Sequence, residues 1–102
     1  MKKIINGKMY NTETANYIGS HRSDCYKNDF RYFEEDLYQK KTKEFFLYGE
    51  GGAMTKYAEY VQGCGYTYGE KIIPLSEDEA KEWVEENMDV DDYIKLFGEC
   101  EE

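Results

Sequence analysis

The chain has 102 residues, 17% of them aromatic, and a formal net charge of -9 at pH 7. A chain of this length can bury roughly 65% of its unfolded surface, so we expect a single domain, residues 1–102, with a modest core of Tyr, Phe and Trp. The acidic total argues against direct binding to nucleic-acid phosphates or anionic membranes. Because no stretch resembles a signal peptide or a membrane span, we expect a cytoplasmic protein.

The N-terminal residues predict a hairpin followed by a short helix. Residues 2–5 and 8–10 flank Asn6-Gly7, a dipeptide that favours a type I′ turn because both of its residues tolerate positive φ. Residues 11–19, NTETANYIG, predict a short N-terminal helix, with a capping Asn or Thr, apolar residues three apart and a closing glycine. The polar residues 20–29 are expected to form a loop.

Residues 30–48 contain two aromatic-rich runs, RYFEEDLYQ and EFFLYG, on either side of a basic spacer. Runs of this composition favour strands, and the spacer favours a hairpin turn. Within the first run, Glu34, Glu35 and Asp36 must alternate between the two faces of a strand, so they cannot converge as a catalytic pair. We interpret these three acids as a solvated strand face.

The glycine-rich GEGGAM interrupts the strand pattern and lacks the spacing of a phosphate-binding loop. Residues 55–62 fit either a helical turn or an irregular crossing. Residues 66–75, YTYGEKIIPL, predict a further strand, with Gly69 as a candidate bulge. Pro74 is expected to end this strand because proline cannot donate to a ladder.

The C-terminal quarter predicts two helices. Ser76 and Glu79 form a capping box for a helix over residues 76–87. Its apolar stripe consists of Ala80, Trp83, Val84 and Met88. Asp89 is expected to cap a second helix that Gly98 ends. The apolar positions of that second helix are Val90, Tyr93, Ile94 and Phe97.

Most of the negative charge belongs to these helices. Residues 76–102 hold 12 acidic and two basic residues, a local net charge of -10, whereas residues 1–75 are nearly neutral. Like charges one helical turn apart destabilise a helix by a few tenths of a kcal/mol per pair. A sequence retains such a cost more readily when the negative electrostatic field of the helix has a function. Helical carboxylates so spaced lie about 5 to 6 Å apart, comparable to phosphates along a nucleic-acid strand. The candidate partner-binding residues are Asp78, Glu82, Glu85, Glu86, Asp89 and Asp92.

Two other sets of residues suggest different functions. Lys40, Lys41 and Lys43 precede an aromatic run and could neutralise and stack single-stranded RNA, or simply form a basic hairpin tip. Cys25 with His21 is the nearest approach to a nucleophile and a base, but no orienting third group is evident. The single histidine and the scattered cysteines, which we expect to be free thiols, argue against a metal, and no cofactor is expected.

Three segments, KKIINGKMYNTETA, LYGEGGAMTKYAEY and GEKIIPLSEDEAKEW, resemble small anti-CRISPR proteins that inhibit type II-A systems and come from phages and mobile elements of Gram-positive bacteria. The shared motifs are structural, so no catalytic residue is implied. The resemblance implies stoichiometric binding to a type II CRISPR effector nuclease, whose nucleic-acid channels are strongly positive, with guide RNA present or in competition.

Together these features predict an α+β fold, a small antiparallel sheet of hairpins with a short N-terminal helix and two short C-terminal acidic helices. We expect a protein inhibitor and not an enzyme. The alternatives are an RNA-binding accessory protein that uses the hairpin over residues 40–48, and a small enzyme built around Cys25 and His21.

Overall fold

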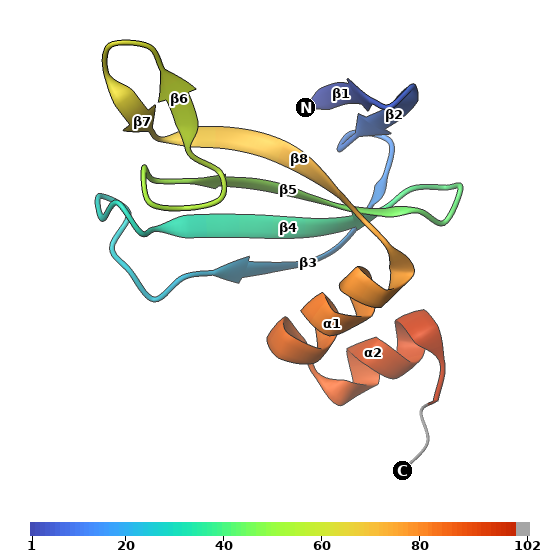
Figure 1. Cartoon of the computed structure of the whole chain (residues 1–102). Coiled ribbons are helices and arrows are strands. Elements are labelled where there is room, and N and C mark those ends of the chain that lie inside the picture. Colours follow the sequence, from blue (N-terminus) through green and yellow to red (C-terminus); the bar gives the residue numbers. More distant parts are fainter. Residues whose placement is uncertain (100–102) are drawn as a thin grey trace.

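A four-stranded antiparallel sheet forms the centre of the computed structural model, which describes residues 1–99 (Figure 1). The strand order is β3-β4-β5-β8, so β3 and β8 are the edges. The two aromatic-rich runs form two paired strands, as predicted, and these strands are the central pair of the sheet. The bounds of the four strands are β3 Asn16–Arg22, β4 Phe33–Gln39, β5 Phe45–Gly51 and β8 Gly69–Leu75.

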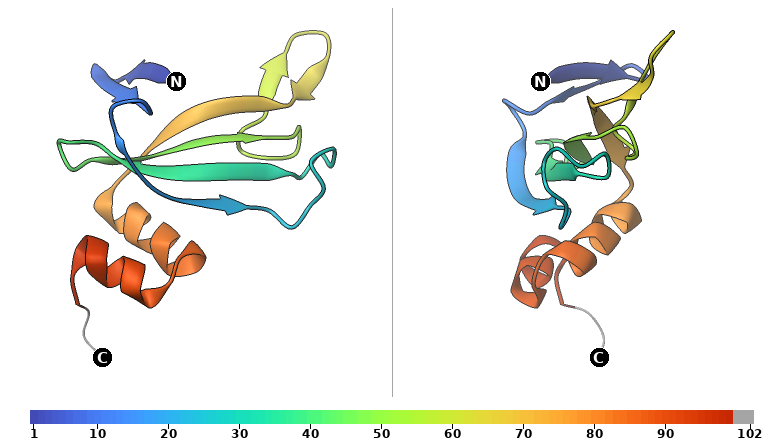
Figure 2. Two further views of the ribbon diagram at one scale, coloured as in Figure 1. Left: turned by 180° about the vertical axis from the view of Figure 1, so that it is seen from behind. Right: turned by 90° about the vertical axis from the view of Figure 1, so that its left-hand side faces the viewer.

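The two faces of this sheet carry separate hydrophobic clusters. On one face Leu37, Leu47 and Ile73 lie opposite one another in register and pack against the C-terminal helices. On the other face Phe46 and Ile72 pack with Tyr10 of the N-terminal hairpin. The hairpin and the helices therefore lie on opposite sides of the sheet, as the edge-on view in Figure 2 shows.

The N-terminal hairpin pairs β1 (Lys2–Ile5) with β2 (Lys8–Asn11). The turn residues Asn6 and Gly7 have φ values of 52° and 79°, so the positive-φ turn expected from the dipeptide is confirmed.

The predicted N-terminal helix over residues 11–19 is wrong. The amides of Thr14 and Ala15 both donate to the carbonyl of Asn11, and this turn leads directly into β3, which pairs with β4 from residue 16 to residue 22. Pairing along a whole strand outweighs the weak local preference for one helical turn. Gly19 does not end a helix: a Cβ there would lie 2.9 Å from the Met88 side chain, so the glycine permits close approach of the helices.

A second small hairpin pairs β6 (Glu59–Val61) with β7 (Gly65–Thr67), and it projects from the end of the sheet farthest from the helices (Figure 1). Residues 59–61 are thus a strand. Gly69 is not a bulge but the first residue of β8, in unbroken register with Gly51. Pro74 does not end β8, because an edge strand tolerates a residue without an amide hydrogen, and the strand continues to Leu75.

The two helices are α1 (Glu77–Asn87) and α2 (Val90–Phe97). The capping box is confirmed, since the Glu79 amide donates to Ser76 Oγ at 3.1 Å and the Ser76 amide donates to Glu79 Oε1 at 2.9 Å. Asp89 caps α2 and Gly98 follows it, as predicted. Neither α1 nor α2, the helices within the described residues, has the length and apolar character needed to cross a bilayer.

The apolar stripe of α1 is confirmed, but the buried side of α2 is rotated from its predicted position. Tyr93, Leu96 and Phe97 pack against the core, whereas Val90 is 73% exposed and Ile94 is 39% exposed. Because Leu96 is part of the side of α2 that packs against the core, the side that carries Val90 faces solvent. The α+β class and the two C-terminal helices are therefore as expected, and only the N-terminal helix is absent from residues 1–99.

Candidate functional site

The outer side of α1 carries four exposed carboxylates. With about 3.6 residues per turn, their positions fall on the side of the helix opposite to the buried Ala80, Trp83 and Val84. Among the described residues, no lysine or arginine forms an ion pair with any of the four. We call this surface the acidic face, and its members are Asp78, Glu82, Glu85 and Glu86.

The only basic residue of α1 is turned away from the acidic face. Lys81 Nζ lies 3.7 Å from Glu77 Oε1, and it also lies 5.7 Å from the centroid of the Phe97 ring. The field of the acidic face is therefore not compensated within α1, and it extends into solvent.

The other two predicted binding residues have different surroundings. Asp89 is exposed, but its Oδ1 accepts the amide of Asp92 at 2.9 Å, so its carboxylate also serves as the N-cap of α2. Asp92 is half-buried and lines a separate hollow together with Tyr17 and Lys95. The structure thus groups four of the six predicted acids on one surface, places Asp89 at its end, and separates Asp92 from it.

A rigid attachment of α1 to the sheet comes from a buried carboxylate, Glu35. Its side chain accepts hydrogen bonds from Tyr57 Oη at 2.5 Å and from Trp83 Nε1 at 3.0 Å, and Lys56 Nζ lies 2.8 Å away. Gly49 makes room for the Tyr57 ring, because a Cβ there would lie 2.2 Å from it. Three segments of the chain therefore meet at one buried carboxyl group.

The electrostatics of Glu35 explain why it remains charged. Burial raises the pKa of this carboxyl, but the hydrogen bonds from Lys56, Tyr57 and Trp83 outweigh burial and hold the pKa below its ordinary value. Burial and the hydrogen bond to Glu35 raise the pKa of Tyr57, so its hydroxyl keeps its proton.

The interpretation of Glu35 as a solvated residue is wrong. Strand alternation could have revealed its burial, because Glu35 shares a face with Leu37.

The opposite face of the sheet holds a second group of carboxylates that the sequence did not reveal. Glu34, Glu50 and Glu70 lie directly opposite one another across β4, β5 and β8. We call them the open-face row. Tyr32 Oη donates to Glu34 at 2.5 Å, and Tyr48 Oη donates to Glu70 at 2.7 Å.

The open-face row is partly neutralised by its neighbours. The hydrogen bond shared by Glu34 and Glu50 raises the pKa of Glu50 and lowers that of Glu34. Arg22 Nε lies 3.6 Å from Glu34 Oε2. The row therefore presents less free negative charge than the acidic face does.

The basic hairpin between β4 and β5 is less available to RNA than its sequence suggests. Lys40 Nζ lies 4.4 Å from the Tyr10 ring centroid and 3.5 Å from Glu44 Oε1, while Lys41 and Lys43 are exposed. The following Phe45 and Phe46 are buried in the two cores. Aromatic rings that fill a core cannot stack on bases, so Phe45 and Phe46 provide no stacking platform.

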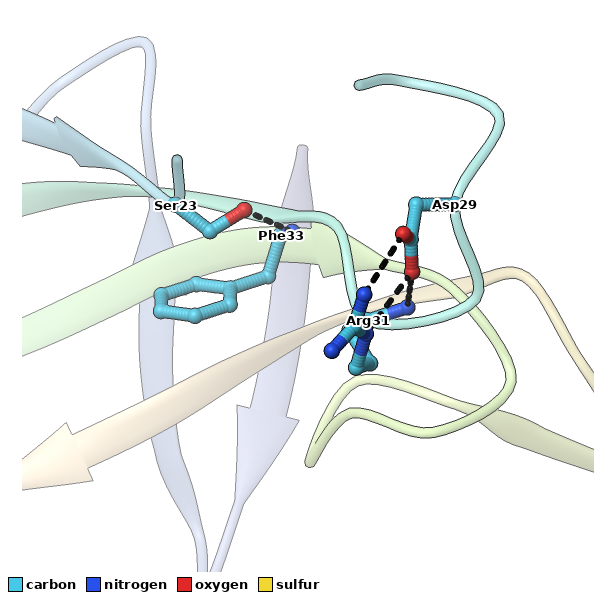
Figure 3. Close-up of polar contacts among 4 residues, drawn as sticks. All are labelled: Ser23, Asp29, Arg31 and Phe33. Atoms are coloured by element: carbon cyan, nitrogen blue, oxygen red, sulfur yellow. Dashed lines mark hydrogen bonds and ion pairs between the residues drawn. The ribbon is translucent and has the colours of Figure 1, made fainter. Parts of the chain in front are cut away.

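Cys25 and His21 lie in different structural elements. His21 lies in β3, its ring 5.7 Å from that of Phe33, whereas Cys25 lies in the loop after β3. Figure 3 shows how this loop is held: Ser23 Oγ accepts the Phe33 amide at 3.1 Å.

The same loop neutralises one of the two arginines. The Asp29 carboxylate accepts hydrogen bonds from the backbone amide of Arg31 at 2.8 Å and from its guanidinium at 3.1 and 3.2 Å (Figure 3). These hydrogen bonds lower the pKa of Asp29. Within residues 1–99, no group of three or more His, Cys, Asp or Glu side chains is arranged to hold a metal ion.

Comparison of the chain with protein-family models, with curated proteins and with solved structures finds no match.

Proposed function

We propose that this chain is a stoichiometric inhibitor of a type II CRISPR effector nuclease and that the acidic face docks on one of the positive nucleic-acid channels of that enzyme. The observation that carries the proposal is the acidic face itself, four exposed carboxylates without a cationic partner among the described residues. The resemblance of three segments of the sequence to small anti-CRISPR proteins supports the choice of partner.

The arrangement of α1 suits the imitation of a phosphate strand. Residues at i, i+3 and i+4 on a helix have Cβ atoms about 5 to 6 Å apart, and α1 is held to the sheet by the contact between Trp83 and Glu35. A helix that is already fixed to the sheet loses little backbone entropy on binding, and its negative charges accelerate encounter with a basic channel. Guide RNA or target DNA would compete for the same channel.

The mode of action in this proposal is binding and not turnover. Inhibition would then require about one inhibitor per nuclease and would fall steeply as salt screens the charges. A functional role for the basic hairpin as an RNA-binding site receives less support, because Lys40 is engaged by Tyr10 and Glu44 and the adjoining phenylalanines are buried.

A pull-down of a purified type II-A effector nuclease with the tagged chain, with and without guide RNA, tests the proposal. We expect capture of the nuclease and a change in capture when guide RNA is loaded. A gel-shift with guide RNA alone serves as the control and should show no complex. Failure to capture the nuclease in either state, or tight binding of free guide RNA, would contradict the proposal.

A further inference from the structure

A groove runs along the junction of the two helices, beside the acidic face. Its volume is about 510 Å³, within the range of many ligand-binding pockets. Met88, Val90, Tyr93 and Ile94 supply its apolar lining. The junction is short because Met88 is the C-cap of α1 and the next residue, Asp89, is the N-cap of α2, so the two helices diverge from two adjacent residues.

Two of the apolar side chains in the groove are not explained by the fold. Val90 is 73% exposed and Ile94 is 39% exposed, and neither belongs to the side chains that pack against the core. Valine and isoleucine are also weaker helix formers than Ala, Leu, Glu or Lys, so helix propensity does not account for them. An exposed apolar surface of this kind, next to charged residues, is typical of an interaction site.

The charges around the groove are all negative. Glu85, Asp89 and Glu99 line it, and no lysine or arginine does so among the described residues. Lys95, the only basic residue of α2, instead lines the separate hollow that contains Asp92. An apolar centre with a charged rim is the usual anatomy of a protein–protein contact.

We propose that this groove binds a protein segment in which adjacent apolar side chains are flanked by arginine or lysine. The apolar side chains contact Val90 and Ile94, and the flanking cations face Glu85 and Asp89. The inference rests on the proposed function only for the identity of the protein that supplies the segment. The groove adds an apolar contact that phosphate mimicry alone does not include. Part of the binding free energy is therefore not weakened by salt.

Two short peptides of equal charge test the groove directly. The probes are the acetylated and amidated peptides KRLLRK and KRSSRK, titrated into the full ¹⁵N-labelled chain. We expect KRLLRK to give saturable shifts of the Val90 and Ile94 amides and to bind at least about tenfold more tightly, since burying a single leucine side chain is worth that much. Its binding should persist at about 0.5 M NaCl, where exposed charges are largely screened.

The inference is overturned if the two peptides bind equally, or if the shifts caused by KRLLRK map outside the groove. A Val90→Ser and Ile94→Ser double variant should lose the preference for KRLLRK, while Val61→Ser, which changes an exposed valine of β6, should retain it. The inference is also overturned if a double variant with the circular dichroism spectrum of the parent retains the preference for KRLLRK. Should the double variant unfold, the comparison of the two peptides on the parent chain still decides.

The nuclease separates this inference from the proposed function. If the parent binds KRLLRK in the groove but captures no nuclease, the groove stands and the proposed function fails. If the parent and the folded double variant capture the nuclease equally at every salt concentration, the groove is overturned as the docking site and the proposed function stands.

Discussion

Trp83 Nε1 donates a 3.0 Å hydrogen bond to Glu35 Oε1, and this bond joins α1 to the central sheet across 48 positions of sequence. Both residues are buried, at 7% and 4% exposure. The hydrogen bond matters for function because it fixes the helix that carries the acidic face. The indole also fills the cluster formed with Leu37 and Leu47.

Two substitutions of Trp83 should separate packing from hydrogen bonding. Trp83→Ala should reduce the free energy of unfolding by about 3 to 5 kcal/mol, because it removes a large buried side chain. Trp83→Phe should reduce it by about 1 to 3 kcal/mol, because most of the packing remains while Glu35 loses one donor. Urea denaturation followed by circular dichroism measures both losses. Tryptophan fluorescence cannot be used, because Trp83 is the only tryptophan and both substitutions remove it. No loss of stability in Trp83→Phe would contradict a separate role for the hydrogen bond.

Glu35→Gln should destabilise the fold in a pH-dependent way. The folded pKa of Glu35 lies below its ordinary value of 4.5, so the charged carboxyl stabilises the fold above that pH and this contribution is lost as pH falls through the folded pKa. We expect a loss of about 1 to 3 kcal/mol at pH 7, which shrinks in acid. The exposed Glu59→Gln serves as the control and should change stability by less than about 0.5 kcal/mol. A loss that is the same at every pH would contradict a charged Glu35.

Glu50→Gln should stabilise the protein at neutral pH. Glu50 lies directly opposite two other glutamates, and its hydrogen bond with Glu34 raises its pKa, so the folded state disfavours its ionised form. Its destabilising effect is therefore present at pH 7 and is relieved as pH falls through the raised pKa. Thermal unfolding at pH 7 should report a gain of about 0.2 to 1 kcal/mol. A loss of stability would show that the open-face row is not repulsive.

Ser76→Ala should reduce the free energy of unfolding by about 1 kcal/mol, because the Glu79 amide then loses its partner at the start of α1. Chemical denaturation measures the change. Ser20→Ala, at an exposed position of β3, is a matched control and should cost less. Equal effects of the two substitutions would mean that the capping box contributes nothing to stability.

Local hydrogen-bond chemistry explains the parts of the fold that the sequence predicted well. The Asn6-Gly7 turn, the Ser76 capping box and the Asp89 cap each depend on residues that are adjacent or three apart, and all three are confirmed. The helix predicted over residues 11–19 failed because its local signals were weak beside strand pairing with β4.

The features that the sequence did not reveal depend on distant parts of the chain. The open-face row requires the register of three strands, and Glu70 is 20 positions from Glu50. The exposure of Val90 follows from the side on which Leu96 packs. Glu35 was predictable in part, because strand alternation already placed it beside Leu37, but its three donors come from residues 56, 57 and 83.

The central proposal concerns the acidic face, and charge reversal on that face provides its most direct test. Glu82→Lys, Glu85→Lys and Glu86→Lys together spare both helix caps, and at two units each they change the formal net charge from -9 to -3. The control makes the same change in charge at three exposed acids elsewhere, through Glu13→Lys, Asp24→Lys and Glu59→Lys. Circular dichroism must show that both variants are folded.

The measurement is DNA cleavage by a guide-loaded type II-A effector nuclease, titrated with the parent and with each variant at a fixed salt concentration. We expect the parent and the control to inhibit at about one molecule per nuclease, and the variant of the acidic face to lose inhibition, because repulsion replaces attraction in a positive channel. Full inhibition by the folded acidic-face variant would contradict the proposal that this face binds the nuclease.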